Sequence, residues 1–186
     1  MTDEESLRRL LLARSVRHGD FVLSSGQPSS YYIDCRLSTM SAEGMVLIGR
    51  MGLAAIRQAG WAPKAVGGLT MGADPVAYAI AAASHGTELE IDAFSVRKEP
   101  KAHGTGQQIE GNFRAGYPVV VVEDTITTGG SAQRAMEAVE AAGGKVLGVL
   151  AVVDREEGGR GALEGSGLEV VVLTTVTRLG MGQGGR

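Results

Sequence analysis

Hydrophobic residues occur in short runs that alternate along the chain with amphipathic stretches. The run Val119–Val122 consists of four β-branched residues, which predicts a strand buried on both faces of a parallel sheet. Similar short apolar segments predict further strands at 65–68, 89–96, 146–153 and 170–175. Because helical patterns separate most of these strands, the chain is predicted to be an α/β protein with a mostly parallel central sheet flanked by helices.

Four stretches carry helical signals. Thr2 and Glu5 are spaced as a capping box, and leucines follow at helical intervals to about residue 15. Ser41 is expected to cap a second helix that ends at Gly60. Asp74 is expected to be the N-cap of a third helix, with proline at its first position, running through residues 85–86. The fourth has its apolar residues at Ala132, Ala135, Met136 and Val139.

Residues 21–36 do not follow the alternation of strand and helix. Two short β-like pieces flank a turn rich in Gly, Pro and Ser, which predicts a hairpin outside the main α/β unit. His18, just before it, is expected to lie in a polar turn. We therefore expect one domain over 1–186, with about residues 1–40 and the C-terminal edge forming a small hood.

The composition narrows the classes of protein. At 186 residues and 44% hydrophobic content, the chain can bury a core without cross-links. Its only cysteine, Cys35, excludes an internal disulfide and favours a reducing, cytoplasmic setting. No apolar run approaches 18 residues and no signal peptide is evident, so we expect a soluble protein without a membrane partner. The net charge of -3 argues against nucleic acid as a partner.

Candidate chemistry begins at the end of the valine run. Glu123 and Asp124 follow it, then a Thr/Gly/Ser loop at 125–131, then a helix. Such a loop presents free N–H groups and hydroxyls at the positive end of the helix dipole, which suits a phosphate. The acids would repel a phosphate but accept hydrogen bonds from hydroxyls on the same ligand, so a sugar phosphate fits. An ordinary capped turn with two solvated acids is the alternative.

A second candidate is the basic segment that follows the strand ending at Val96. Three cationic residues, a histidine and two glycines occur between 97 and 106. Such a loop can close over a diphosphate and neutralise its charge, although charge runs are more often solvated surface.

Two further features lie at predicted strand ends. Arg155 follows the strand at 146–153, where side chains face the ligand crevice of a parallel sheet, so it can pair with a substrate carboxylate. A plain surface arginine is the alternative. Gly67 and Gly68 are expected to form a tight turn that admits a ligand close to the backbone.

The segment 119–131 resembles the phosphoribosyl-pyrophosphate (PRPP) signature of the type I phosphoribosyltransferases: four hydrophobic residues, two acids and a Thr/Gly-rich loop. The resemblance implies the fold of that family, with Glu123 and Asp124 near the ribose hydroxyls and Asp124 in a catalytic role. It also implies that the 5-phosphate is held by Thr125, Ile126, Thr127, Thr128, Gly129, Gly130 and Ser131.

Other segments resemble the orotate phosphoribosyltransferases in particular. The pattern Phe-x-Leu-x-Ser-Gly followed by Ser-x-x-Tyr-x-Asp-x-Arg, between residues 21 and 36, is similar to the hood that covers the pyrimidine. One departure is Ser24, where many members carry a lysine that contacts PRPP. The resemblance also implies that Arg155, with Thr127, binds orotate.

The basic segment resembles the catalytic loop of the same family. The resemblance implies that Arg97 and Lys98 bind PRPP and that Lys101 and His103 are catalytic residues on the diphosphate. It further implies a homodimer, because this loop commonly reaches the neighbouring subunit's site. Magnesium is expected as the cofactor, held mainly by the substrate with no direct protein ligand.

The expected reaction is transfer of the 5-phosphoribosyl group from PRPP to orotate, giving orotidine 5′-monophosphate and pyrophosphate. A purine or uracil phosphoribosyltransferase would share the PRPP signature, although Arg155 and the hood argue against it. A regulator that senses PRPP without catalysis is the alternative from another class. It should carry a basic face or a nucleic-acid-binding domain, and the sequence shows neither.

Overall fold

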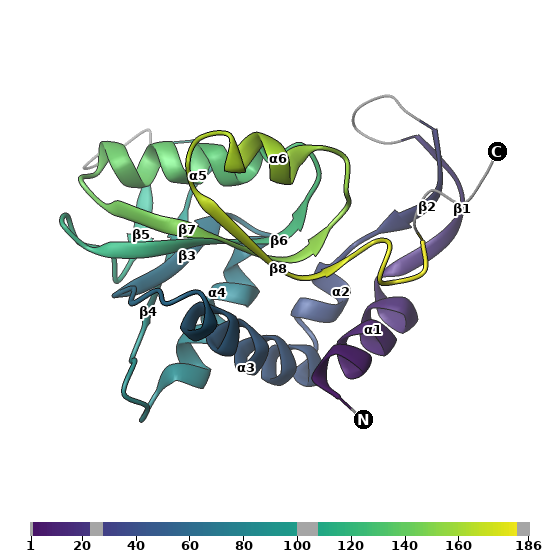
Figure 1. Cartoon of the computed structure of the whole chain (residues 1–186), viewed down its shortest axis with the longest axis horizontal. Helices are drawn as coiled ribbons and strands as arrows, with labels where there is room; N and C mark the ends of the chain where they lie inside the picture. The colour runs from purple at the N-terminus through teal and green to yellow at the C-terminus, as the bar shows by residue number, and fades with distance from the viewer. Residues whose placement is uncertain (1, 23–27, 100–107, 182–186) are drawn as a thin grey trace.

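The central element is a six-stranded sheet with the order β5-β4-β3-β6-β7-β8 (Figure 1). The computed structural model describes residues 2–22, 28–99 and 108–181. All neighbouring strands are parallel except β5, which is antiparallel to β4. The predicted α/β class and mostly parallel sheet are therefore confirmed. The strands are β3 (Ala65–Leu69), β4 (Asp92–Val96), β5 (Ile109–Gly111), β6 (Pro118–Ile126), β7 (Lys145–Asp154) and β8 (Glu169–Thr175).

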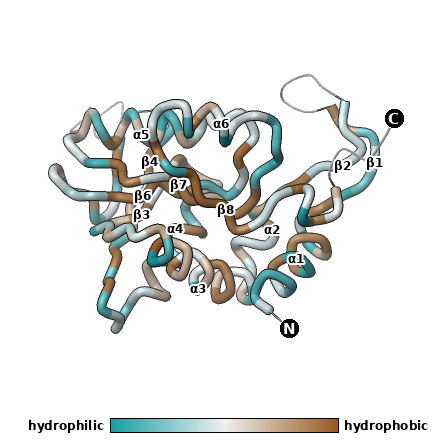
Figure 2. The backbone as a smooth tube through the Cα atoms, viewed as in Figure 1, coloured by the Kyte–Doolittle hydropathy of each residue, from teal (hydrophilic) through white to brown (hydrophobic). Residues whose placement is uncertain are grey.

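Helices cover both faces of this sheet. Figure 1 shows α5 and α6 on one face and α3 and α4 on the other, with α1 beside α3. Figure 2 shows that the most hydrophobic stretches lie in the strands between these layers. No helix in the described parts of the chain combines the length and apolar character that crossing a membrane requires. The helices are α1 (Asp3–Arg14), α2 (Arg36–Thr39), α3 (Ala42–Gln58), α4 (Ala73–Ser84), α5 (Gly130–Ala141) and α6 (Gly159–Glu164).

The valine run lies at the centre of the molecule. Val119 and Val121 pack in the core beneath α5 and α6, whereas Val120 and Val122 pack in the core beneath α3 and α4. Successive side chains of a strand point to opposite faces, so a continuous apolar run is needed where both faces are covered. All four side chains are fully buried, which confirms the prediction.

The predicted hairpin is a two-stranded antiparallel sheet, formed by β1 (Val16–Val22) and β2 (Pro28–Ile33) beside the main body. The described strands confirm the prediction; Ser24 lies outside the described residues. The interpretation of His18 as a turn residue was wrong, because it lies within β1 opposite Tyr31. A short polar stretch can form a strand when its partner strand supplies the backbone hydrogen bonds. The segment after β8 also reaches this region, where Leu179 packs in the same core cluster as Leu7.

Helix starts follow the predicted capping residues at two of three places. The Thr2 hydroxyl accepts a hydrogen bond from Glu5 N, and Ser41 accepts one from Gly44 N. Asp74, however, is not an N-cap. Helix α4 begins two residues earlier than predicted, at Ala73 after Gly72, and the Asp74 carboxylate accepts a hydrogen bond from Ser95 Oγ at 2.7 Å. The Asp74 side chain therefore ties α4 to β4 instead of closing the helix end.

Gly67 and Gly68 do not form the expected turn. Both lie inside β3, fully enclosed by its neighbours. A Cβ at Gly67 would collide with Phe94, and one at Gly68 would collide with the carbonyl of Val122. These glycines thus allow close strand packing, and the turn itself falls at residues 70–72, where the Thr70–Met71 peptide is cis.

Candidate active site

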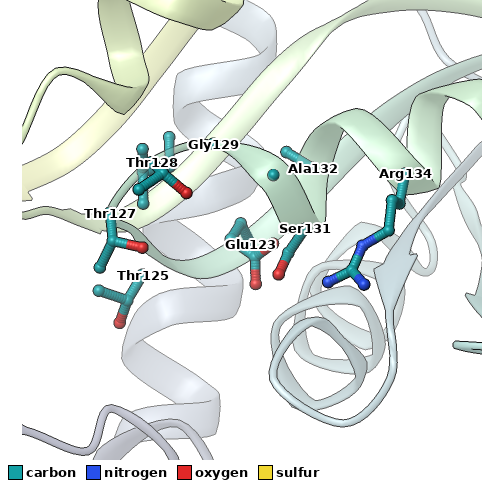
Figure 3. A pocket seen from close by; sticks show the side chains of 10 residues that line it. Glu123, Thr125, Thr127, Thr128, Gly129, Ser131, Ala132 and Arg134 are labelled. Atoms are coloured by element: carbon teal, nitrogen blue, oxygen red, sulfur yellow. The ribbon is translucent and has the colours of Figure 1, made fainter. Parts of the chain in front are cut away.

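The loop between β6 and α5 forms one wall of a cavity of about 430 Å³. Gly129, in the left-handed conformation at φ 83°, allows the chain to turn directly into α5. Figure 3 shows the hydroxyls of Thr125, Thr127 and Ser131 around the same space. The cavity is lined by Glu123, Thr125, Ile126, Thr127, Thr128, Gly129, Gly130, Ser131, Ala132 and Arg134.

The loop at 125–131, called the phosphate loop below, packs against α6. Gly159 N donates a hydrogen bond to the carbonyl of Thr127 at 3.0 Å, and the left-handed Gly129 lies against Gly159 and Leu163. The Ile126 side chain is buried in the core, so only its backbone faces the cavity. The N–H groups at the start of α5 are therefore held in place and aimed at the cavity, as phosphate binding requires.

The acid pair lies where β6 meets this loop. The Glu123 side chain lines the cavity and is buried, and its Oε2 has no hydrogen-bond partner among the described residues. Burial raises the pKa of Glu123, and the nearby Asp124 carboxylate raises it further. Asp124 lies against Gly72, at the start of α4, and burial raises its pKa as well. A buried acceptor without a donor is suited to a ligand hydroxyl.

Arg134 is a cavity residue that the sequence reasoning missed. It lies at the start of the second turn of α5, three residues after Ser131, and Figure 3 shows its guanidinium beside Ser131 and Glu123. Its positive charge opposes the rise in the pKa of Glu123. The helical spacing from the phosphate loop was the signal that could have identified it.

Arg155 follows β7, and its backbone N donates to the carbonyl of Ile126 at 2.9 Å. This bond brings it next to the end of β6. Arg155 is 7% exposed, and its guanidinium packs over the ring of Tyr31 from the hood, at 5.3 Å from the ring centroid. Its Nε lies 2.8 Å from Glu157 Oε1 without an aligned hydrogen bond, and its Nη2 has no hydrogen-bond partner within the described residues. A buried guanidinium with free N–H groups is a ready site for a carboxylate.

The basic segment is described only at its base. Arg97 and Lys98 are exposed after β4, and Arg97 exchanges hydrogen bonds with Gln108, on the other side of the segment. Arg97 also approaches Glu110 at 3.6 Å. Lys101 and His103 lie outside the described residues. The two ends of the predicted catalytic loop are therefore joined at its base.

The chain resembles known proteins over nearly its whole length. A family model described as "Phosphoribosyl transferase domain" matches residues 43–164. The orotate phosphoribosyltransferase of Rhodopirellula baltica is 44% identical over 183 residues, covering 96% of this chain and 95% of the relative. That of Aquifex aeolicus is 46% identical over 182 residues, covering 96% and 98%.

The chain belongs to the orotate phosphoribosyltransferase family.

Solved structures of the family agree with this fold. The Mycobacterium tuberculosis orotate phosphoribosyltransferase in complex with PRPP is 41% identical, with a TM-score of 0.81 over 96% of this chain and 99% of that one. The same enzyme in complex with Fe(III) dicitrate is 45% identical, with a TM-score of 0.85 and the same coverage. The predicted family and fold are thereby confirmed.

Two charged residues of the hood pattern at 21–36 form a local ion pair. Arg36 and Asp34 make two parallel hydrogen bonds, at 2.8 and 2.9 Å, and the charge of Arg36 opposes the rise in the pKa of Asp124. Cys35 between them is buried, and burial raises the pKa of its thiol to about 12. The thiol is thus protonated and inert, and the charge of Arg36 acts on the acid pair from the start of α2.

Proposed function

We propose that this protein transfers the 5-phosphoribosyl group from PRPP to orotate, forming orotidine 5′-monophosphate and pyrophosphate in pyrimidine nucleotide biosynthesis. The observation that carries the proposal is the combination of a cavity formed by the 125–131 loop with two nearby buried side chains that each have an atom without a hydrogen-bond partner. One is an acceptor on Glu123 and the other is a donor on Arg155. A phosphorylated sugar and an acidic base supply the partners that these groups lack.

Different site residues are proposed to bind different parts of the two substrates. The N-terminal end of α5 with its loop takes the 5-phosphate, and Glu123 and Asp124 accept hydrogen bonds from the ribose hydroxyls. Asp124 lies beside the turn at 70–72, so the diphosphate is expected between that turn and the basic loop. Arg155 binds the orotate carboxylate, with Thr127 close to the base.

The reaction needs no protein nucleophile, because a ring nitrogen of orotate attacks the anomeric carbon as the diphosphate leaves. Positive charge builds on the ribose and negative charge on the diphosphate. Glu123 and Asp124 orient the ribose through its hydroxyls. Lys101 and His103 of the basic loop, with Arg97 and Lys98, stabilise the negative charge on the diphosphate. Arg134, at the phosphate end, adds a positive charge that sequence reasoning did not assign.

Magnesium is proposed as the cofactor. The described residues contain no group of three or more His, Cys, Asp or Glu side chains arranged to hold a metal ion. The ion is proposed to be held mainly by the substrate, since magnesium prefers phosphate and water ligands. When bound, it neutralises charge on the departing diphosphate.

A homodimer with shared sites is proposed from the resemblance of the basic loop. Exposed apolar side chains support it: Leu37, Met40 and Met71 line a common depression on the surface, and each is more than 40% exposed. Such clustering favours association with another apolar surface, here a second copy of the chain. A cytoplasmic location is proposed from the single buried cysteine.

The deciding experiment follows the absorbance of orotate with purified protein, PRPP and Mg²⁺. We expect consumption of orotate that requires both PRPP and the metal ion. A panel containing uracil, adenine, guanine and hypoxanthine tests the alternative bases. Turnover of one of these in preference to orotate would overturn the base assignment, and binding of PRPP without turnover of any base would favour the regulator.

A further inference from the structure

Glu156, immediately after Arg155, adopts an unusual backbone conformation. Its φ is 57°, in the left-handed region, and every other residue with positive φ in the described chain is a glycine. A side chain in this region carries a conformational cost, so the surrounding contacts must hold it there.

Two sets of hydrogen bonds hold Glu156. Its backbone N donates to Asp154 Oδ1 at 2.8 Å. Its carboxylate Oε2 accepts from the backbone N and the hydroxyl of Thr177, at 2.9 and 2.6 Å. The hydroxyl bond lowers the pKa of Glu156, as does the backbone bond, so the carboxylate is charged at neutral pH. Glu156 therefore connects the end of β7 to the turn after β8.

This connection fixes the backbone around Arg155 on both sides. Upstream, the Asp154 carbonyl accepts from Val176 N at 3.0 Å, and Arg155 N is bonded to Ile126. Downstream, the two hydrogen bonds from Thr177 to the Glu156 carboxylate, here called the Thr177 clamp, hold the conformation of Glu156. The Glu156 side chain is exposed and does not line the cavity of the phosphate loop, so this contact serves the backbone and not the 5-phosphate.

Glu157 can compete with a substrate for Arg155, so the conformation of the turn at Glu156 matters. Glu157 Oε1 lies 2.8 Å from Arg155 Nε. If these two atoms were aligned as a hydrogen bond, Glu157 would occupy the guanidinium in place of a substrate carboxylate. In the observed turn, Nε lacks an aligned bond and Nη2 stays free. We propose that Glu156 is a positioning residue for orotate recognition: its carboxylate, bonded to Thr177, holds the turn in which Arg155 presents its free N–H groups to the substrate carboxylate. This inference rests on the proposed function of Arg155.

The test compares variants of the full-length protein by steady-state kinetics for each substrate. Glu156→Ala should raise the KM for orotate about fivefold to tenfold, with the KM for PRPP unchanged, because hydrogen bonds to a charged acceptor are lost at an exposed position. Glu156→Gln retains an oxygen acceptor for Thr177 and should restore most of the orotate KM. Thr177→Val should reproduce part of the Ala effect. Glu164→Ala, which removes an exposed glutamate of α6, is the matched control and should change neither KM.

Glu156→Gly separates the carboxylate from the backbone conformation. Glycine adopts positive φ without cost. The Gly variant should show the same rise in orotate KM as the Ala variant, although its melting temperature should be higher than that of the Ala variant. Recovery of the wild-type orotate KM in the Gly variant would overturn the clamp.

Three further outcomes can be distinguished. An unchanged orotate KM in Glu156→Ala, in a protein whose Arg155→Ala variant loses orotate affinity, would overturn this inference and leave the proposed function intact. Intact orotate use in Arg155→Ala would overturn the base assignment itself. An equal rise in both KM values for Glu156→Ala would indicate a general structural role and overturn the positioning role.

Discussion

At the scale of single residues, the site is built from groups that are incompletely satisfied in the chain by itself. The Glu123 carboxylate is buried without a donor for Oε2, and the Arg155 guanidinium is buried with Nη2 free. Each arrangement costs free energy that a well-bonded or apolar residue would avoid. Stability alone therefore does not explain these side chains, and the proposed ligands would supply the missing partners.

Glu123→Gln is expected to stabilise the protein while impairing catalysis. The raised pKa of Glu123 means that, above its unfolded value near 4.5, the native state binds more protons than the unfolded state, so the free energy of unfolding falls as pH rises. Glutamine does not ionise, so the variant should not lose stability in this way as the pH rises. Urea unfolding should show a gain of about 1–3 kcal/mol at pH 8 and a smaller one at pH 5.5, while the KM for PRPP rises.

The control for this prediction is Glu137→Gln, on the exposed side of α5, which should show no pH-dependent gain. An equal gain for Glu123→Gln at both pH values would show that the buried charge does not destabilise the native state.

Arg155→Ala is expected to damage the use of orotate selectively. Removing a guanidinium that pairs with a carboxylate should raise the KM for orotate at least about tenfold, since charged hydrogen bonds contribute roughly 1.5–3 kcal/mol. The KM for PRPP should change little. Initial rates with each substrate varied in turn measure both constants, and unaltered orotate kinetics would contradict the assignment.

At the scale of elements, apolar periodicity predicted most helices and strands. A strand buried between two helical layers needs a continuous apolar run, and a helix covering the sheet needs apolar residues along one face. The exceptions have local causes. Asp74 resembled an N-cap, but its carboxylate bonds to Ser95 across the fold. Gly67 and Gly68 resembled a turn, but their lack of side chains serves strand packing against Phe94 and Val122. Both contacts depend on residues distant in sequence, which a local pattern does not reveal.

The element with the largest predicted catalytic effect is the basic loop. Arg97 and Gln108 join its ends, while Lys101 lies outside the described residues. Lys101→Ala should lower turnover by about 10²-fold or more, the range for preorganised charge stabilisers, with little change in the melting temperature. Lys145→Ala, at the exposed start of β7, is the matched control. Turnover at the wild-type rate in Lys101→Ala would remove this loop from the mechanism.

At the scale of the whole molecule, the order of strand, acid pair, loop and helix around the cavity was predictable from sequence, but the contact between the hood and the end of the sheet was not. The valine run, the acids and the loop are contiguous, so one motif defined them. The contact between Tyr31 and Arg155 joins residues separated by most of the chain, and only the tertiary structure brings them together. Family resemblance had associated the hood with the pyrimidine without indicating which tyrosine faces the arginine.

The proposed dimer is tested by complementation between two impaired variants. Lys101→Ala retains an intact pocket, and Arg155→Ala retains an intact loop. If the loop of one subunit acts in the site of the other, mixing the two proteins under subunit exchange should restore activity with orotate. Light scattering should give twice the mass of one chain. A monomeric mass, or a mixture no more active than its components, would contradict shared sites.

The pairing of β6 with β7 has a consequence for substrate choice. Ile126 and Asp154 lie opposite each other in register; Ile126 ends β6 within the loop at 125–131, and Asp154 ends β7 immediately before Arg155. Each residue of a strand advances the chain by about 3.3 Å, so this alignment sets the interval between the loop proposed to bind the phosphate and the arginine proposed to bind the base. The sheet thereby restricts the overall length of the molecule that fits, and a deletion of one residue in β7 would exclude the natural nucleotide while leaving free phosphate able to bind.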